Sequence, residues 1–164
     1  MIGSDETLSP REPPPTHALR LTFAYRDSDL RLVGSQRVEM LVPPAVTAPP
    51  ATGQSGYWLQ VTDASGRIVY HRHLHQPIAV DAEVYAPDAK QTIARMPLAQ
   101  CEGQFSVLMP DLPQAQSFAL HGPPDPKVPA APAQELIRLD VDTLRKFRPP
   151  RPDGEPAPDA PKGS

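Results

Sequence analysis

Three of the chain's five histidines are spaced two residues apart in one short stretch, at His71, His73 and His75. Alternate residues of a β-strand share one face, so in a strand these imidazoles would lie about 7 Å from their neighbours. Neutral imidazole is a common zinc ligand, and two imidazoles at that spacing can share one ion. The stretch is therefore a candidate metal site.

A third ligand could come from the next predicted strand, where Asp81 and Glu83 fall together on one face. The alternative is that the histidines form the solvated face of a hairpin, as exposed and independent imidazoles. We favour this alternative and expect no bound cofactor. The histidines alternate with Arg72, whose charge disfavours a nearby dication unless it points to the opposite face.

Aromatic side chains offer a second kind of site. Tyr57, Trp58 and Tyr85 could form a platform for a glycan or a peptide, although aromatic residues on strands usually pack in a core or at an edge. Nucleophilic catalysis has no comparable pattern, since the chain lacks a Gly-x-Ser-x-Gly elbow and a glycine-rich phosphate loop. The single cysteine, Cys101, is expected to be structural, and we expect the chain not to be an enzyme.

The elements that must position these residues are predicted to be strands. Apolar residues alternate with other residues over 19–25, and apolar stretches over 57–62 and 67–74 flank a turn, Asp63 to Gly66, that predicts a hairpin. Further strands are predicted at 30–42, 78–85, 91–98, 104–109 and 116–121. Seven or eight strands without an amphipathic helix between them predict an all-β sandwich or barrel.

The alternation also predicts which side chains are buried and where one strand bends. Gly34 and Ser35 within 30–42 indicate a bulge. The predicted core residues are Leu19, Leu21, Phe23, Leu59, Val61, Ile68, Tyr70, Phe105, Val107 and Leu120.

Proline divides the chain into three parts. The 24 prolines are unevenly placed, and they predict a disordered leader at 1–17, a folded domain at 18–122 and a proline-rich tail at 123–164 that begins with a stiff spacer. The tail holds one apolar island at 135–147, whose alternation favours an added strand followed by a turn over a patchy helical face. Left unpaired, the island would instead be available to a partner.

Charge and hydropathy exclude several classes of protein. The net charge of −3 and the absence of a basic segment argue against nucleic-acid binding. The sequence contains no run of 18 apolar residues, so it predicts no membrane-spanning helix. One cysteine and the lack of a secretory signal peptide predict a cytoplasmic protein, although signal-independent export stays open.

Three segments carry a family resemblance: 57–63, 68–72 and 105–110 with Pro113. They resemble the N-terminal β-sandwich of bacterial M64 (IgA-type) peptidases, and also a set of uncharacterised single-domain bacterial proteins. The resemblance implies an immunoglobulin-like, two-sheet antiparallel sandwich. It carries over no catalytic residue, because no histidine here is followed by glutamate and the zinc motif His-Glu-x-x-His is missing.

Together these observations predict a non-enzymatic β-sandwich that serves as an interaction or structural module in a bacterial protein assembly, with a protein as its partner. Two proline-rich arms would extend its reach without folding. The alternatives are a sandwich that binds a glycan or a peptide through its aromatic strands, and a metal-binding protein that uses the histidine strand.

Overall fold

A computed structural model of the chain describes residues 16–46, 51–85 and 93–149, although not the side chains of 83–85 and 93–94. Within these ranges the chain is mostly β, in antiparallel sheets with one short helix. The elements are β1 (Ala18–Arg26), β2 (Asp29–Val38), β3 (Tyr57–Thr62), β4 (Ile68–Leu74), β5 (Asp81–Tyr85), β6 (Ile93–Pro97), β7 (Glu102–Pro110), β8 (Ser117–Gly122), β9 (Gln134–Asp140) and α1 (Val141–Lys146).

The first sheet has three strands in the order β2-β1-β7. A tight turn joins β1 to β2, and Asp27 in that turn has a positive φ of 51°. Thr22 pairs with Gly34 but Phe23 pairs with Leu32, so Val33 is an extra residue in the ladder. The bulge predicted at Gly34 and Ser35 is therefore confirmed, and the extra residue is the adjacent Val33.

The second sheet has four strands in the order β4-β3-β8-β9. The β3–β4 hairpin is confirmed, since Asp63 accepts hydrogen bonds at Oδ1 from the backbone N–H groups of Ser65 and Arg67. Gly66 closes the turn with a φ of 82°, a conformation that favours glycine. β8, from much later in the chain, pairs with the other side of β3.

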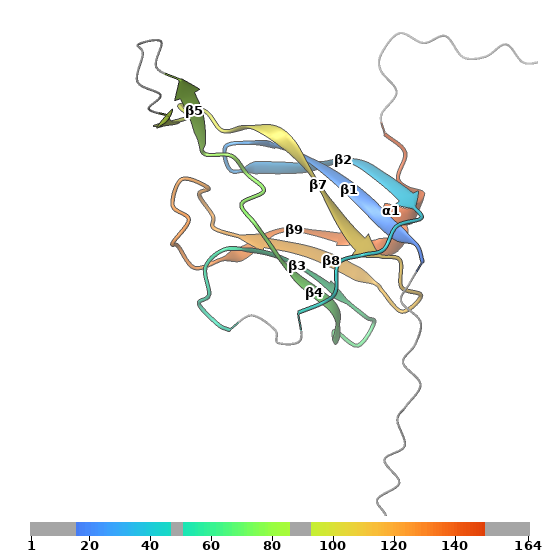
Figure 1. Cartoon of the computed structure of the whole chain (residues 1–164). Helices are drawn as coiled ribbons and strands as arrows, with labels where there is room; N and C mark the ends of the chain where they lie inside the picture. Colours follow the sequence, from blue (N-terminus) through green and yellow to red (C-terminus); the bar gives the residue numbers. More distant parts are fainter. Residues whose placement is uncertain (1–15, 47–50, 86–92, 150–164) are drawn as a thin grey trace, which may run out of the picture.

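The two sheets face each other across one hydrophobic core, as Figure 1 shows. Phe23 on β1 is fully buried at the centre, with its ring centroid 5.5 Å from that of Phe105 on β7 and 5.9 Å from that of Phe118 on β8. The remaining buried residues of this core are Leu19, Leu21, Leu59, Val61, Tyr70, Val107, Met109, Ala115, Leu120, Val141 and Leu144.

The apolar island completes this architecture. The predicted strand is confirmed as β9, which pairs with β8, but the predicted turn is replaced by the helix α1. Asp140 caps the helix by accepting a hydrogen bond from the N–H of Thr143, and Val141 and Leu144 are buried in the core. The sheet thus continues beyond Gly122, where the sequence placed the end of the folded domain.

The segment before β9 is not the predicted stiff spacer. Between 123 and 133 the backbone forms two turns, with N–H groups of Val128 and Ala131 donating to the carbonyls of Asp125 and Val128. Pro123 is fully buried. The prolines here shape a packed loop, because a fixed φ suits turns as well as extended chain.

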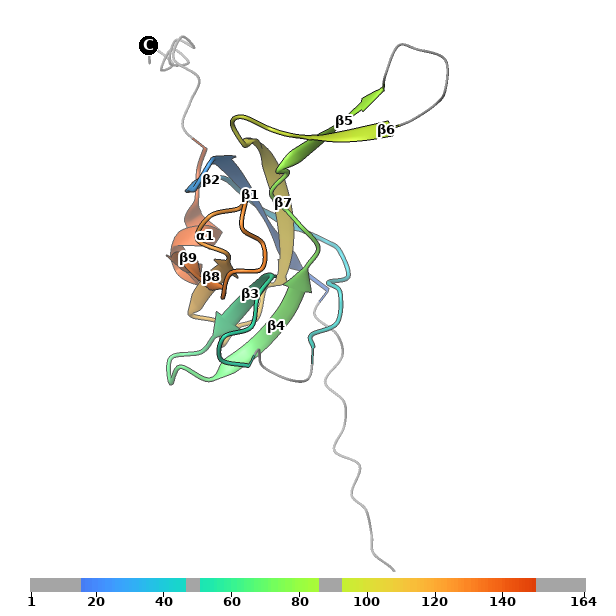
Figure 2. The same cartoon turned by 90° about the vertical axis from the view of Figure 1, so that its left-hand side faces the viewer.

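β5 and β6 form a separate hairpin that projects from the two sheets (Figures 1 and 2). Its base packs through Ile78, Val80 and Leu98 on a second buried cluster that contains Tyr25, Tyr57 and Cys101. Cys101 is fully buried in this cluster, in agreement with a structural role. Because β5 pairs with β6 in this separate hairpin, it does not continue the sheet that carries β4.

Two glycines make room for the tyrosines of that cluster. A Cβ at Gly103 would lie 2.6 Å from the hydroxyl oxygen of Tyr25, and one at Gly122 would lie 2.5 Å from ring carbons of Tyr57. Each tyrosine thus covers a glycine on the neighbouring strand. A methyl group at either position would force the ring to move.

Two predicted core positions differ from the structure. Ile68 is 38 % exposed, because it begins β4 next to the bulge in the β3–β4 ladder. Phe105 is only partly buried against the core. The other predicted core residues are buried.

The predicted strand at 30–42 ends at Val38, and the strand predicted at 104–109 begins earlier, at Glu102, as β7. The leader up to residue 15 and the tail from residue 150 lie outside the described residues. His17 at the end of the predicted leader accepts a backbone hydrogen bond from Asp111.

Candidate functional site

The predicted histidine strand is confirmed as β4, but it brings together only two of the three histidines. The ring centroids of His71 and His73 are 5.1 Å apart, with the ring planes at 76°. His75 lies one residue beyond the end of β4 and is exposed.

Trp58 connects these imidazoles to a further histidine that sequence reasoning missed. Trp58 pairs across the sheet with His73 on β4 and with His121 on β8. Its indole stacks on the His121 ring at a centroid distance of 5.3 Å and 10°, and meets the His73 ring at 6.3 Å and 66°. We call Trp58, His71, His73 and His121 the histidine–tryptophan cluster.

The cluster is only in part the solvated face that the sequence favoured, since His73 is exposed but His71 is buried. His71 is only 2 % exposed, and both of its ring nitrogens lack a hydrogen-bond partner among the described residues. Within the same residues, Trp58 Nε1 and His121 Nε2 are also buried without a partner. Burial lowers the pKa of the His71 imidazole, and the neighbouring His73 and His121 lower it further.

Burial also lowers the pKa of His121, an effect that Glu135 opposes and Arg138 reinforces. His71 and His121 are therefore held in their neutral forms.

No three histidine, cysteine, aspartate or glutamate side chains in the described ranges come together as metal ligands. Asp81 belongs to β5, which pairs with β6 rather than with β4, and the side chain of Glu83 lies outside the described residues. The described residues therefore do not assemble the ligand set that the metal hypothesis needs, since catalytic zinc sites take three protein ligands and structural sites four.

We predict that the buried histidines make the fold sensitive to mild acid. Below a pH of about 6.5 the unfolded chain binds protons at His71 and His121 that the folded chain excludes. The free energy of unfolding should therefore fall as the pH drops from about 7.5 to about 5.5, above the range in which carboxylates titrate. Urea titrations at a series of pH values measure the slope.

Replacing His71 with leucine should flatten that slope, because the variant lacks the imidazole whose pKa burial lowers. Equal slopes in the parent chain and in His71→Leu would contradict the assignment of the pH dependence to the buried His71.

The three candidate aromatic residues do not form a platform. Tyr57 and Trp58 are neighbours in β3 and point to opposite faces, and each is about 5 % exposed. Tyr57 packs in the second buried cluster, where burial raises the pKa of its hydroxyl to about 12. Tyr85 ends β5 in the projecting hairpin, and its side chain lies outside the described residues.

A groove of about 330 Å³ lies beside β4, at the edge of the four-stranded sheet. The segment before residue 47 forms its outer wall, where the N–H of Val46 donates to the carbonyl of His71 at 2.8 Å. The groove is lined mainly by the apolar residues Ala45, Val46, Ile68 and Val69. Val46 is 41 % exposed, so both Val46 and Ile68 present apolar surface there.

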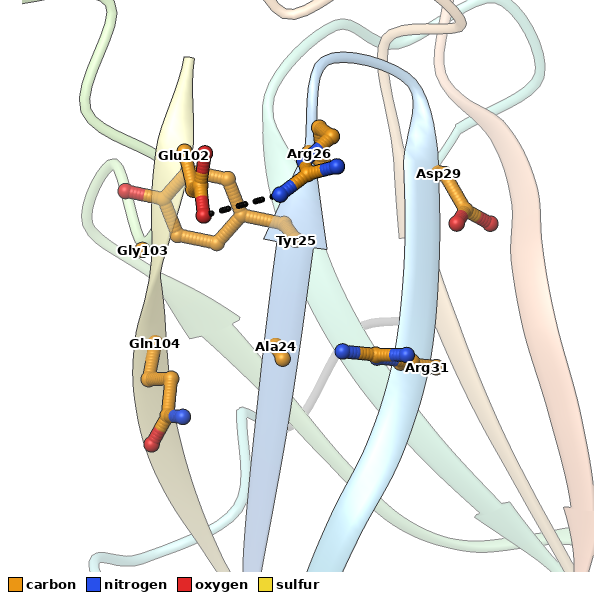
Figure 3. A pocket seen from close by; sticks show the side chains of 8 residues that line it. All are labelled: Ala24, Tyr25, Arg26, Asp29, Arg31, Glu102, Gly103 and Gln104. Atoms are coloured by element: carbon orange, nitrogen blue, oxygen red, sulfur yellow. Dashed lines mark hydrogen bonds and ion pairs between the residues drawn. The ribbon is translucent and has the colours of Figure 1, made fainter.

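A second, polar surface covers the outer face of the three-stranded sheet. A hollow of about 270 Å³ lies there. Figure 3 shows the short side chain of Ala24 between Gln104 on β7 and Arg31 on β2. The ion pair of Arg26 with Glu102, 3.2 Å between Nη2 and Oε1, closes one end.

No protein-family model, no curated protein and no solved structure matches this chain. In the described part of the chain, no helix is long and apolar enough to cross a membrane.

Proposed function

We propose that this chain is a non-enzymatic interaction module that docks a protein partner through the groove beside β4. The observation that carries the proposal is the exposure of Val46 and Ile68, two branched apolar side chains that line the same groove. Burying such side chains against a partner contributes about 25 cal/mol for each Å² removed from water.

The framework that we propose for this module is an immunoglobulin-like sandwich. With β3 taken as strand C, the order β4-β3-β8-β9 corresponds to C′-C-F-G, and β7, which precedes β8, lies in the opposite sheet as strand E does. One connection differs: β2 intervenes between β1, the neighbour of β7, and β3.

The outer wall of the groove is held in place by hydrogen bonds, which supports its use as a docking site. Its outer wall is fixed to β4 by the Val46–His71 backbone hydrogen bond and by the hydroxyl of Tyr70, which donates to the carbonyl of Pro43 at 2.8 Å. A preformed groove loses less conformational entropy on binding than a loop that must first be ordered. An apolar side chain of the partner, inserted between Val46 and Ile68, is the contact that the groove fits.

Photo-crosslinking from inside the groove tests this function. The chain carrying p-benzoylphenylalanine at position 68 should form one specific adduct in its native cells, and the same group at Val128 should not. Val128 is a matched control because it is also exposed and apolar but lies in the loop between β8 and β9.

The purified adduct then identifies the partner, and Ile68→Arg should abolish the complex while Val128→Arg retains it. Both replacements should leave the melting temperature within a few degrees of the parent, because exposed positions contribute roughly 0.5 kcal/mol or less. Adducts from both positions alike, or a partner retained by Ile68→Arg, would refute docking at the groove.

A further inference from the structure

The outer face of the three-stranded sheet carries a trough that the proposed docking function does not use. Alternate residues of β1 reach this face, with Arg20 and Arg26 at the ends and the short Thr22 and Ala24 between them. On β2, Gly34 stands opposite Thr22 and adds no side chain to the floor. We define the trough by its floor, Thr22, Ala24 and Gly34.

Two hollows lie along the trough. The hollow of about 270 Å³ in Figure 3 and a second of about 570 Å³ share Gln104 as a lining residue. The second hollow extends past Thr22 and Gly34 to Arg20. A chain-like ligand of several units could therefore follow the direction of β1.

The positive charges along the trough are only partly neutralised. Arg26 pairs with Glu102, but no acidic partner for Arg31 is found in the described residues. The guanidinium of Arg20 donates to the Met40 sulfur at 3.3 Å rather than to a carboxylate. Arg20 and Arg31 thus lie in different hollows as forked donors that suit carboxylates.

The remaining lining supplies hydrogen-bonding groups at both hollows. Gln36 on β2 pairs with Arg20 and lies level with it, and Gln104 on β7 pairs with Ala24, which also pairs with Arg31. Thr22 lies between these two levels, with its hydroxyl 2.9 Å from that of Ser106. Tyr25 also lines the first hollow, and Val33 and Pro149 line the second, so the trough presents apolar as well as polar groups to a ligand. Asp29 and Glu102 add two carboxylates to the hollow that holds Arg26 and Arg31.

We propose that the trough binds an acidic oligosaccharide, with carboxylates at Arg31 and Arg20 and sugar hydroxyls at the amides of Gln36 and Gln104 and the hydroxyls of Thr22 and Ser106. Charge complementarity selects the acidic groups of the chain, and the dense donors and acceptors replace the water that its hydroxyls lose. Because the face is exposed, binding weakens as the salt concentration rises.

Calorimetric titration of the full chain with tetragalacturonate at low salt tests this proposal. We expect Arg31→Gln to weaken binding about tenfold or more, which corresponds to the loss of a charge-assisted hydrogen-bonded pair. Arg67→Gln removes the same charge from the β3–β4 turn, away from the trough, and should bind as the parent does. Ala24→Tyr should fill the hollow and abolish binding.

Neutral cellotetraose should bind at least about tenfold more weakly than tetragalacturonate. Equal binding of the two sugars, no binding of either, or no effect of Arg31→Gln would overturn the proposal. Tetraglutamate bound as tightly, and lost in Arg31→Gln, would overturn it in favour of an acidic peptide. If Ala24→Tyr does not fold, Arg31→Gln alone decides, because its exposed side chain has no acidic partner to lose among the described residues.

Discussion

Phe23→Ala is expected to lower the free energy of unfolding by about 3–5 kcal/mol, out of a total of about 5–15 kcal/mol. The Phe23 ring is fully buried and stacks on Phe105 from its own sheet and on Phe118 from the opposite one. Alanine would leave a cavity between the two sheets, and neither neighbouring ring can fill it without leaving its own contacts. Urea unfolding followed by circular dichroism measures the loss.

Two matched variants make the test specific to the core. Phe105→Ala should cost less than Phe23→Ala, because Phe105 is only partly buried. Ile68→Ala should change stability by about 0.5 kcal/mol or less, since Ile68 is exposed beside the groove. A loss for Ile68→Ala as large as that for Phe23→Ala would contradict the register of β4, and the reverse order of the two phenylalanines would contradict that of β1 against β7.

The sequence predicted the fold best where the signal is local. Alternation over 19–25 predicted the buried face of β1, and the turn at 63–66 predicted the β3–β4 hairpin. Alternation failed at Ile68, because the bulge in the β3–β4 ladder breaks the period there. A bulge depends on how two strands pair, and the residue pattern of either strand alone does not predict that pairing.

The histidine–tryptophan cluster shows the same limit for a site. The spacing of His71 and His73 correctly predicted that both lie on one face of β4, because alternation within one strand is a local pattern. His121 joins them only because β8 pairs with β3 in a register that sets His121 beside Trp58. That pairing joins residues about sixty positions apart, and no feature of the sequence fixes it.

Burial of the cluster could not be predicted either. An alternating strand at a sheet edge predicts one buried and one solvated face, yet His71 and Trp58 on the face away from the core are almost fully buried. Imidazole and indole rings that stack across strands cover one another, so part of that burial comes from side chains the pattern had assigned to solvent.

A chain ending at Gly122 is expected to lose cooperative unfolding. It would lack β9, leaving β8 as a bare edge, and it would lack α1, whose Val141 and Leu144 are buried in the main core. Each fully buried aliphatic side chain contributes about 1.5–3 kcal/mol, and the partly buried Ile137 and Leu139 add to the loss. The sum approaches the total stability of an ordinary domain.

A chain of residues 16–148 is the control for this truncation, since it keeps every strand and the helix, and its melting temperature should equal that of the full chain. Leu144→Ala in the full chain tests the packing of α1 without shortening the chain. It should lower the free energy of unfolding by about 2–5 kcal/mol, because Leu144 is buried. A chain ending at Gly122 that still melts cooperatively at the parent temperature would mean that β9 and α1 add nothing to the fold. The apolar island would then be free for a partner, as an unpaired amphipathic segment is.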